Sequence, residues 1–106
     1  MKIRKCLSFD DILLVPQMSS VTSRKEISLT SSLSNCPDFC LPIISSPMDT
    51  VTETEMALSM SSHGGLGIIH RYNTIENQVL MAKDVQSRGG LVVAAIGASG
   101  DYIDRA

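Results

Sequence analysis

The strongest constraint on the fold is a pattern of strand, loop, helix, turn and strand between residues 41 and 70. Residues 41–44 form a short apolar run with two isoleucines, typical of a strand buried on both faces. Residues 45–50 are polar and include a proline, so the strand ends there. A second apolar run at 66–69 predicts another buried strand.

The segment between these two strands has the marks of one helix. Thr52 is a natural N-cap, and Glu55 three residues later completes a capping box. Gly64 and Gly65 end the helix before the second strand begins. A strand, a helix and a strand in this order predict a βαβ unit, and therefore an α/β fold with a parallel sheet.

The pattern continues toward the carboxyl end. Thr74 is the expected N-cap of a second helix, which ends at Gly89 and Gly90. Residues 91–96 predict a third buried strand, and a further helix begins at Asp101. In parallel sheets the functional residues lie in the loops after the carboxyl ends of the strands. Those loops are residues 45–50, 70–74 and 97–100.

The first forty residues are less regular. Residues 12–15 predict a short strand or extended segment, ended by Pro16. A polar loop rich in Ser and Thr follows at 17–25, and the alternating residues 26–30 predict a half-exposed strand.

Composition excludes several classes of function. The chain has 106 residues and a net charge of −2, without a basic patch, so we expect no nucleic-acid partner. It has no apolar run long enough for a transmembrane segment, so we expect no membrane partner. Cys6, Cys36 and Cys40 are an odd number without a secretory signal, which favours the reducing cytoplasm. Cys36 and Cys40 lack a second pair, so we expect no metal site, and all three cysteines are interpreted as structural.

Four segments in order resemble the IMP dehydrogenase and GMP reductase family. They are residues 46–53 (Ser-Pro-Met-Asp-Thr-Val-Thr-Glu), 64–70 (Gly-Gly-Leu-Gly-Ile-Ile-His), 7–16 and 91–97. The resemblance implies the amino-terminal portion of a TIM (β/α)₈ barrel with an extra N-terminal strand.

A complete barrel needs roughly 250 residues, so this chain would supply only part of one. Residues 1–106 would then be a partial catalytic barrel domain. Residues 1–40 would be its N-terminal extension and residues 41–106 its first βαβαβ segment. The direct connection between the second helix and the third strand, at 85–90, implies that there is no CBS domain.

The resemblance also implies an activity. NAD-dependent oxidation of IMP to XMP is preferred, because residues 50–53 and 64–65 follow the dehydrogenase pattern. NADPH-dependent conversion of GMP to IMP, by a GMP reductase, is the alternative, favoured by residues 23–26 and by the missing insert. The resemblance further implies a purine nucleotide monophosphate as ligand, a homo-tetramer and a monovalent cation in the intact enzyme.

The cysteine nucleophile of the family has no counterpart here, so no catalytic residue is assigned to this chain. A different class of function therefore stays open. The chain could be an inactive fragment, or an assembly or complementation partner of a companion polypeptide that carries the rest of the barrel.

The resemblance places ligand contacts at three residues. Ser46 would contact the nucleotide, Met48 would pack against the purine, and Ser99 would border the adenosine end of the dinucleotide. Structural roles compete with each of these, because Ser46 could cap a turn, Met48 could fill the core, and Ser99 could cap the helix near Asp101. A catalytic role for His70 is less favoured than a hydrogen-bonded structural one.

Overall fold

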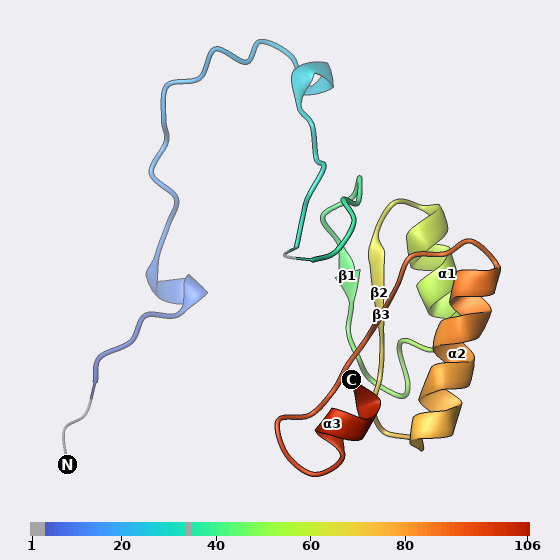
Figure 1. Cartoon of the computed structure of the whole chain (residues 1–106). Coiled ribbons are helices and arrows are strands. Elements are labelled where there is room, and N and C mark those ends of the chain that lie inside the picture. Colours follow the sequence, from blue (N-terminus) through green and yellow to red (C-terminus); the bar gives the residue numbers. More distant parts are fainter. Residues whose placement is uncertain (1–3, 34) are drawn as a thin grey trace.

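The computed structural model describes residues 4–33 and 35–106. Residues 4–30, here called the arm, form a long irregular stretch that runs apart from the rest of the chain, while residues 41–106, here called the sheet unit, hold the strands and the longer helices (Figure 1). The Cα radius of gyration is 18.1 Å, against about 13 Å for a compact chain of this length. The difference reflects the arm.

The sheet unit contains three parallel strands in sequence order. They are β1 (Ile44–Ser45), β2 (Leu66–Ile69) and β3 (Val92–Ala94), with β2 in the middle. Ser45 lies opposite Gly67 in the register of β1 and β2, and Gly67 lies opposite Val92 in that of β2 and β3. The predicted α/β fold with a parallel sheet is confirmed.

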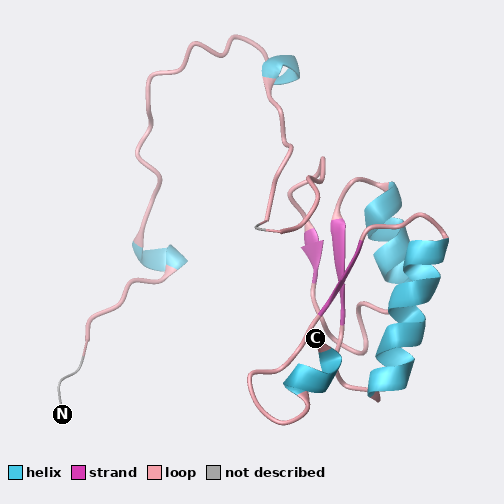
Figure 2. Cartoon of the chain, viewed as in Figure 1, coloured by secondary structure: helices cyan, strands magenta, loops and turns pink. Residues whose placement is uncertain are grey.

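Both crossover helices lie on the same side of this sheet (Figure 2). Helix α1 spans Thr54–Ser62 and helix α2 spans Ile75–Ser87, and the two pack against each other as well as against the strands. The core between the layers is built around Ala57, Ile69 and Val85, which are fully buried. Burial of such side chains from water is the main stabilising contribution to the unit.

Two glycines allow this close packing. A Cβ atom at Gly67 would lie 2.6 Å from the Cα of Ala57, so β2 and α1 approach each other at a point that admits no side chain. Gly64 has a φ of 81°, the left-handed conformation that commonly ends a helix. The prediction that Gly64 and Gly65 end the first helix is confirmed.

The second helix follows the sequence pattern closely, whereas β3 is shorter than the predicted 91–96 and has no buried residue. The Thr74 side chain accepts a hydrogen bond from the backbone N–H of Asn77, as expected of an N-cap. Helix α3 (Tyr102–Arg105) follows Asp101 at its expected position. On α2, the apolar Val79 is 41% exposed, while the neighbouring polar Gln78 is buried.

Two predictions about the amino-terminal half are wrong, and for residues 12–15 the strand alternative fails. Helix α1 has Glu53 as its N-cap, not Thr52, because the Thr52 side chain is engaged elsewhere. Residues 26–30 do not form a strand, and residues 12–15, predicted as a short strand or an extended segment, form no strand. The extra N-terminal strand is therefore not found in the described residues. The arm holds only two 3₁₀ turns, η1 (Phe9–Asp11) and η2 (Arg24–Glu26).

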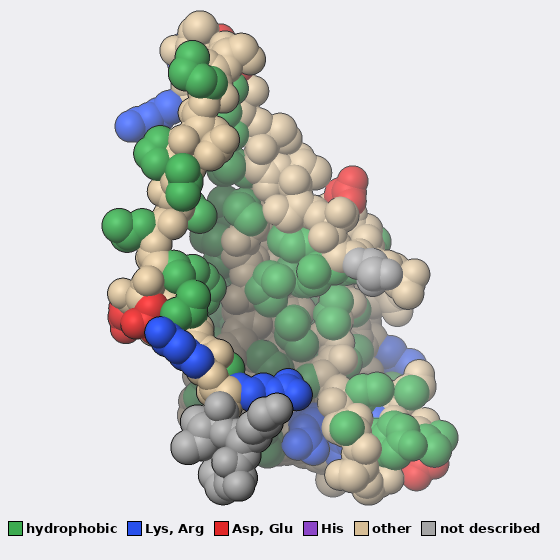
Figure 3. Space-filling model, turned by 90° about the vertical axis from the view of Figure 1, so that its left-hand side faces the viewer, with side chains coloured by type: hydrophobic (Ala, Val, Ile, Leu, Met, Phe, Trp, Pro, Cys, Tyr) green, Lys and Arg blue, Asp and Glu red, His purple; other side chains and the backbone are tan. Residues whose placement is uncertain are grey.

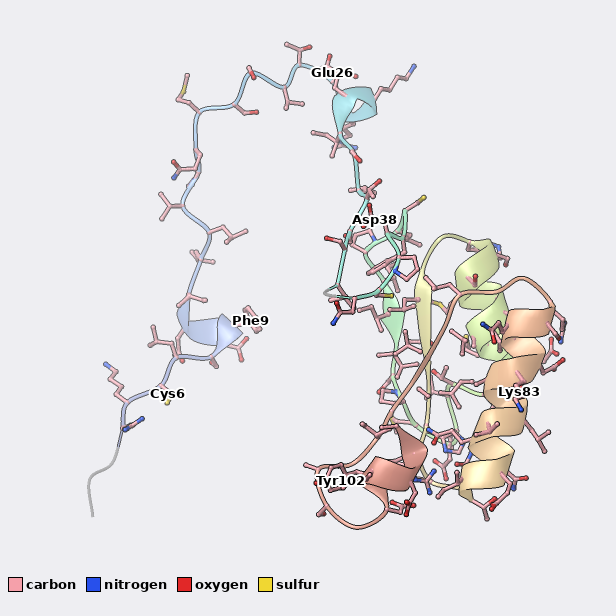
Figure 4. All side chains as sticks on the ribbon, in the orientation of Figure 1. Cys6, Phe9, Glu26, Asp38, Lys83 and Tyr102 are labelled. Atoms are coloured by element: carbon pink, nitrogen blue, oxygen red, sulfur yellow. The ribbon has the colours of Figure 1, made fainter. Side chains whose placement is uncertain are left out.

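The absence of strands in the arm has a physical reason. A strand is stabilised by a hydrogen-bonded neighbour and by burial of one face. The labelled Cys6 and Phe9 lie on the arm, away from the sheet unit (Figure 4), and the Phe9 side chain is 92% exposed. The strand Ile44–Ser45 is likewise shorter than the predicted 41–44, and Ile44 is 43% exposed. The expectation that this strand is buried on both faces is therefore not met.

Candidate functional site

The three loops that follow the strands lie together at the carboxyl ends of the strands, here called the carboxyl edge of the sheet. The first connects β1 to α1 and carries Ser46 and Met48, and the third connects β3 to α3 and carries Ser99. Strands of a sheet are spaced by about 4.8 Å, so the loops after β1 and β3 are separated by roughly 10 Å, with the β2 loop between them. All three side chains are exposed at this edge, with Met48 at 48%.

The first loop is tightly folded by its own backbone. The Met48 carbonyl oxygen accepts hydrogen bonds from the backbone N–H groups of Val51 and Thr52, both at 2.9 Å. The Ser46 carbonyl oxygen accepts from the Met48 N–H at 2.8 Å and from the Thr52 hydroxyl at 2.6 Å. The exposed Met48 side chain therefore stands on a loop whose main chain is held in one arrangement, and it does not fill the core.

His70 lies at the end of β2 and is almost entirely buried. Its Nδ1 accepts the backbone N–H of Tyr72 at 3.1 Å, so in the neutral ring the proton lies on Nε2, which is 3.3 Å from Oε1 of Glu53. The ring thus links the second loop to the residue that caps α1. This geometry is that of a hydrogen-bonded structural histidine, as the sequence analysis preferred.

Gln78 and Arg105 join the second and third loops. Nε2 of Gln78, in the first turn of α2, donates to the carbonyl oxygens of His70 at 3.1 Å and Ala95 at 2.8 Å. Nη1 of Arg105, from α3, donates to Oε1 of Gln78 at 2.9 Å, and Nη2 donates to the Asn73 carbonyl oxygen at 2.7 Å. These bonds hold the ends of β2 and β3 and the start of α3 in a fixed relation.

Sequence reasoning passed over both of these residues. Gln78 carried a usable signal, because a polar residue three positions after Ile75 falls on the apolar stripe of the helix. Arg105 carried no signal for its bonds to the second loop and to α2, since Gln78 and Asn73 lie 27 and 32 residues away along the chain. Its ion pair with Asp101, four residues away, is local.

A cation also lies at this edge. A Cβ atom at Gly97 would lie 3.2 Å from Nη1 of Arg71, so the guanidinium of the second loop covers the start of the third. The Arg71 Cζ lies 5.7 Å from the centre of the Tyr72 ring, within the range of a cation–π contact. The edge therefore offers an exposed positive charge and the Ser99 hydroxyl as donors for an anionic ligand.

The side chain of Asn73, by contrast, has no partner. Its amide oxygen and nitrogen are both buried and make no hydrogen bond within the described part of the chain. Buried polar groups are normally hydrogen-bonded, so this amide marks a place where a water molecule or a ligand atom would be stabilised.

Further polar groups lie around the start of α1. A cavity of about 330 Å³ opens beside the start of α1, lined partly by Asp49, Glu53 and Glu55. Arg88, at the far end of α2, donates to Glu55 at 2.7 Å and lowers the pKa of that carboxyl, first through the hydrogen bond and then through its charge.

The cysteines form no cross-link and no cluster. Cys6 and Cys40 are exposed, Cys36 is half-buried, and all three are free thiols. The exposed pair does not fit the interpretation that all three are structural. Among residues 4–33 and 35–106, no three His, Cys, Asp or Glu side chains come together as metal ligands. In the same residues, no helix is long and apolar enough to cross a membrane.

The chain is similar in sequence to an IMP dehydrogenase and to a GMP reductase. The chain is 43% identical over 93 residues to the inosine-5′-monophosphate dehydrogenase of Nitrosopumilus maritimus, covering 88% of this chain and 20% of that protein. It is 44% identical over 80 residues to the GMP reductase of Leishmania donovani, covering 76% of this chain and 16% of that protein. The chain thus spans about a fifth of the length of these relatives.

The chain is also similar to a solved structure, and it matches a family description. The crystal structure of inosine 5′-monophosphate dehydrogenase from Legionella pneumophila is similar with a TM-score of 0.76 and 35% identity, over 95% of this chain and 31% of that chain. The sequence description of the IMP dehydrogenase / GMP reductase domain matches residues 6–106. Residues 6–106 include all four segments that carried the resemblance. The chain therefore belongs to the IMP dehydrogenase / GMP reductase family of oxidoreductases.

Proposed function

We propose that the chain forms the first strands and helices of a (β/α)₈ barrel whose carboxyl edge binds a purine nucleotide monophosphate. The observation that carries this proposal is the loop after β1, which presents Ser46 and Met48 at that edge. Active sites of such barrels lie at the carboxyl ends of the strands.

The order of the elements supports the barrel. Strands β1, β2 and β3 follow one another in the sheet, and both crossover helices cover the same face. A doubly wound sheet would reverse its strand order and carry helices on both faces, whereas a barrel keeps all its helices outside.

The opposite face of the sheet supports the same proposal. The registers place Ile44, Ile68 and Val93 on the face away from the helices, and Ile44 remains 43% exposed. Figure 3 shows hydrophobic side chains gathered on this side of the molecule, behind the arm. Parallel sheets are normally covered on both faces, so further barrel strands would bury these side chains.

The preferred reaction is the oxidation of IMP to XMP, with NAD as the hydride acceptor. The Ser46 hydroxyl would hydrogen-bond the nucleotide, and the polarisable thioether of Met48 would pack on the flat purine. Arg71 and Ser99 fit an anionic dinucleotide, because the Arg71 guanidinium lies beside Gly97 and the exposed Ser99 hydroxyl belongs to the same loop. The cysteine nucleophile and the monovalent-cation site would come from the rest of the barrel, in a homo-tetrameric, cytoplasmic enzyme.

GMP reduction by NADPH is the second candidate. It is favoured by the near-equal identity of this chain to a GMP reductase, 44%, and to an IMP dehydrogenase, 43%. A non-enzymatic role, as an inactive piece or as a complementation partner of a companion polypeptide, is the third.

The decisive test uses the full protein that carries this chain. Formation of NADH that depends on IMP supports the dehydrogenase, and consumption of NADPH that depends on GMP supports the reductase. In the active case, Ser46→Ala and Met48→Ala are each expected to raise the nucleotide KM about tenfold, the equivalent of about 1.4 kcal/mol of lost binding.

The matched control is Ser59→Ala, an exposed serine on α1 outside the loop, which should leave the nucleotide KM unchanged. Absence of both activities would contradict the enzymatic proposal. An unchanged KM in both loop variants would contradict the assignment of Ser46 and Met48.

A further inference from the structure

Thr52 is a buried polar residue whose side chain serves the loop that precedes it. Its side chain is completely buried, although threonine is usually exposed. Its hydroxyl oxygen lies 2.6 Å from the Ser46 carbonyl oxygen and 2.9 Å from the Ser45 hydroxyl. Its backbone N–H donates to the Met48 carbonyl oxygen at 2.9 Å. One residue therefore bonds to the last residue of β1 and to two residues of the loop between β1 and α1.

The direction of these bonds follows from the number of hydrogens. A hydroxyl has one hydrogen and can accept through its lone pairs. The Ser46 carbonyl can only accept, so Thr52 donates its hydrogen there, and the Ser45 hydroxyl donates to Thr52. Both hydroxyls are satisfied in this arrangement, which holds the end of β1, the loop and the start of α1 together.

We propose that Thr52 is a positioning residue, whose hydroxyl sets the place of Ser46 and Met48 before the nucleotide binds. This inference rests on the proposed function of the loop and extends it to a residue that touches no ligand. Without the bonds to Thr52, this exposed loop of eight residues would lose more conformational entropy when a ligand binds. A loop that Thr52 already holds in place loses less conformational entropy when the nucleotide binds. Removal of the Thr52 hydroxyl should therefore weaken nucleotide affinity.

Three variants of the full protein test this role. Thr52→Val keeps the shape and removes the hydroxyl, while Thr52→Ser keeps the hydroxyl and removes a methyl group. Ser61→Ala is the matched control, because the Ser61 hydroxyl accepts the Leu91 backbone N–H at 2.7 Å, at the opposite edge of the sheet. Each of Thr52→Val and Ser61→Ala leaves a backbone group without its side-chain partner, so both should lower thermal stability.

The nucleotide KM is expected to respond to the loss of the hydroxyl at Thr52 and not at Ser61. Thr52→Val should raise the nucleotide KM about tenfold with a kcat within about twofold of wild type, since the loss is one of pre-organised binding. Thr52→Ser should restore the KM to within about twofold. Ser61→Ala should lower the melting temperature without changing the KM.

A second readout needs no turnover. With isotope-labelled methionine methyl groups, the Met48 resonance of the nucleotide-free protein should move or broaden in Thr52→Val and stay in place in Ser61→Ala. A Met48 resonance that does not respond to Thr52→Val overturns the inference.

The two failures are distinguishable. A wild-type protein that turns over neither nucleotide overturns the proposed function. A wild-type protein that is active, with an unchanged KM in Thr52→Val or no rescue by Thr52→Ser, overturns the role of Thr52 alone.

Discussion

The arm and the sheet unit are both rich in apolar residues, yet only the sheet unit buries them. In the arm, Leu13 is 94% exposed and Leu14 is 97% exposed, whereas in the sheet unit Ile69 and Val85 are fully buried. The two regions belong to one chain and differ in what each apolar side chain can reach. The comparison shows that hydrophobicity alone does not make a core.

The two regions differ in whether residues nearby in the sequence form a second layer for the apolar side chains to pack against. In the sheet unit each strand is followed by a helix that returns over the same sheet face, so the apolar residues meet a second layer formed nearby in sequence. The arm has two 3₁₀ turns and no second layer, so its apolar residues have nothing to pack against within the described chain. In the proposed barrel, its remaining strands and helices would supply packing partners for these residues.

The largest expected effect comes from truncating one apolar side chain in each region. Ile69→Ala should lower the free energy of unfolding by about 2–5 kcal/mol, because it leaves a cavity between the sheet and its helices. Leu14→Ala should change it by less than about 0.5 kcal/mol, because the side chain is already exposed. Urea unfolding of the 106-residue chain, followed by circular dichroism, measures both. Equal losses would show that the arm is packed as firmly as the sheet unit.

A smaller effect on stability is expected where the backbones of β2 and α1 approach each other. Gly67→Ala should destabilise the sheet unit by about 3 kcal/mol, since the new Cβ meets the Cα of Ala57 and neither can move aside. Gly89→Ala is the control, because its Cβ meets no atom within 4 Å. With a φ of 76° it should cost about 1 kcal/mol for the left-handed conformation alone. The same urea unfolding experiment measures both losses of stability. A larger loss in Gly89→Ala than in Gly67→Ala would contradict the close approach of β2 and α1.

The polar link between the loops should contribute less again. Gln78→Leu removes the donor that joins the carbonyl oxygens of His70 and Ala95, at an expected cost of about 2 kcal/mol. The Ala95 N–H, which donates to Ile69, should then exchange with solvent faster. Gln86→Leu, at an exposed position on the same helix, is the control and should leave that exchange unchanged. Equal exchange rates in the two variants would exclude Gln78 as the link.

The smallest effect concerns the surface pair of Glu55 and Arg88. The pKa of Glu55 is lowered in the folded chain, first by the hydrogen bond from Arg88. The contribution of this pair to stability is therefore complete above the pKa of Glu55 in the unfolded chain, and it is lost as pH falls through the lower folded value.

Glu55→Gln tests that contribution. It should remove this part of the pH dependence and change the melting temperature little at neutral pH, since exposed pairs contribute weakly. Melting temperatures at neutral and acidic pH, with and without added salt, measure it. A steeper acid dependence in Glu55→Gln would contradict the assignment.

Sequence patterns predicted most of the sheet unit. The strand at 66–69, the cap at Thr74 and the glycines that end α1 stand where local rules placed them, because each depends on neighbours within a few residues. The same rules misplaced the start of α1, since Thr52 has the chemistry of an N-cap but its hydroxyl bonds to Ser46 instead.

The candidate site was predicted less completely than the fold. Family-like segments pointed to Ser46, Met48 and Ser99, and the structure places all three in loops at one edge of the sheet. Their ligand roles remain predictions. Gln78 and Arg105 were missed because their loop partners depend on how distant segments meet, whereas Thr52 was noticed but given the role of an N-cap.

By itself the sequence determined the order of strands and helices, the ends of α2 and the loops that bear the site, since periodicity and capping act over a few residues. Only the tertiary structure decided which polar side chains brace those loops, and that the arm stays without a second layer. Bonds such as that from Arg105 to Gln78, across 27 residues, form only once the sheet has brought their elements together.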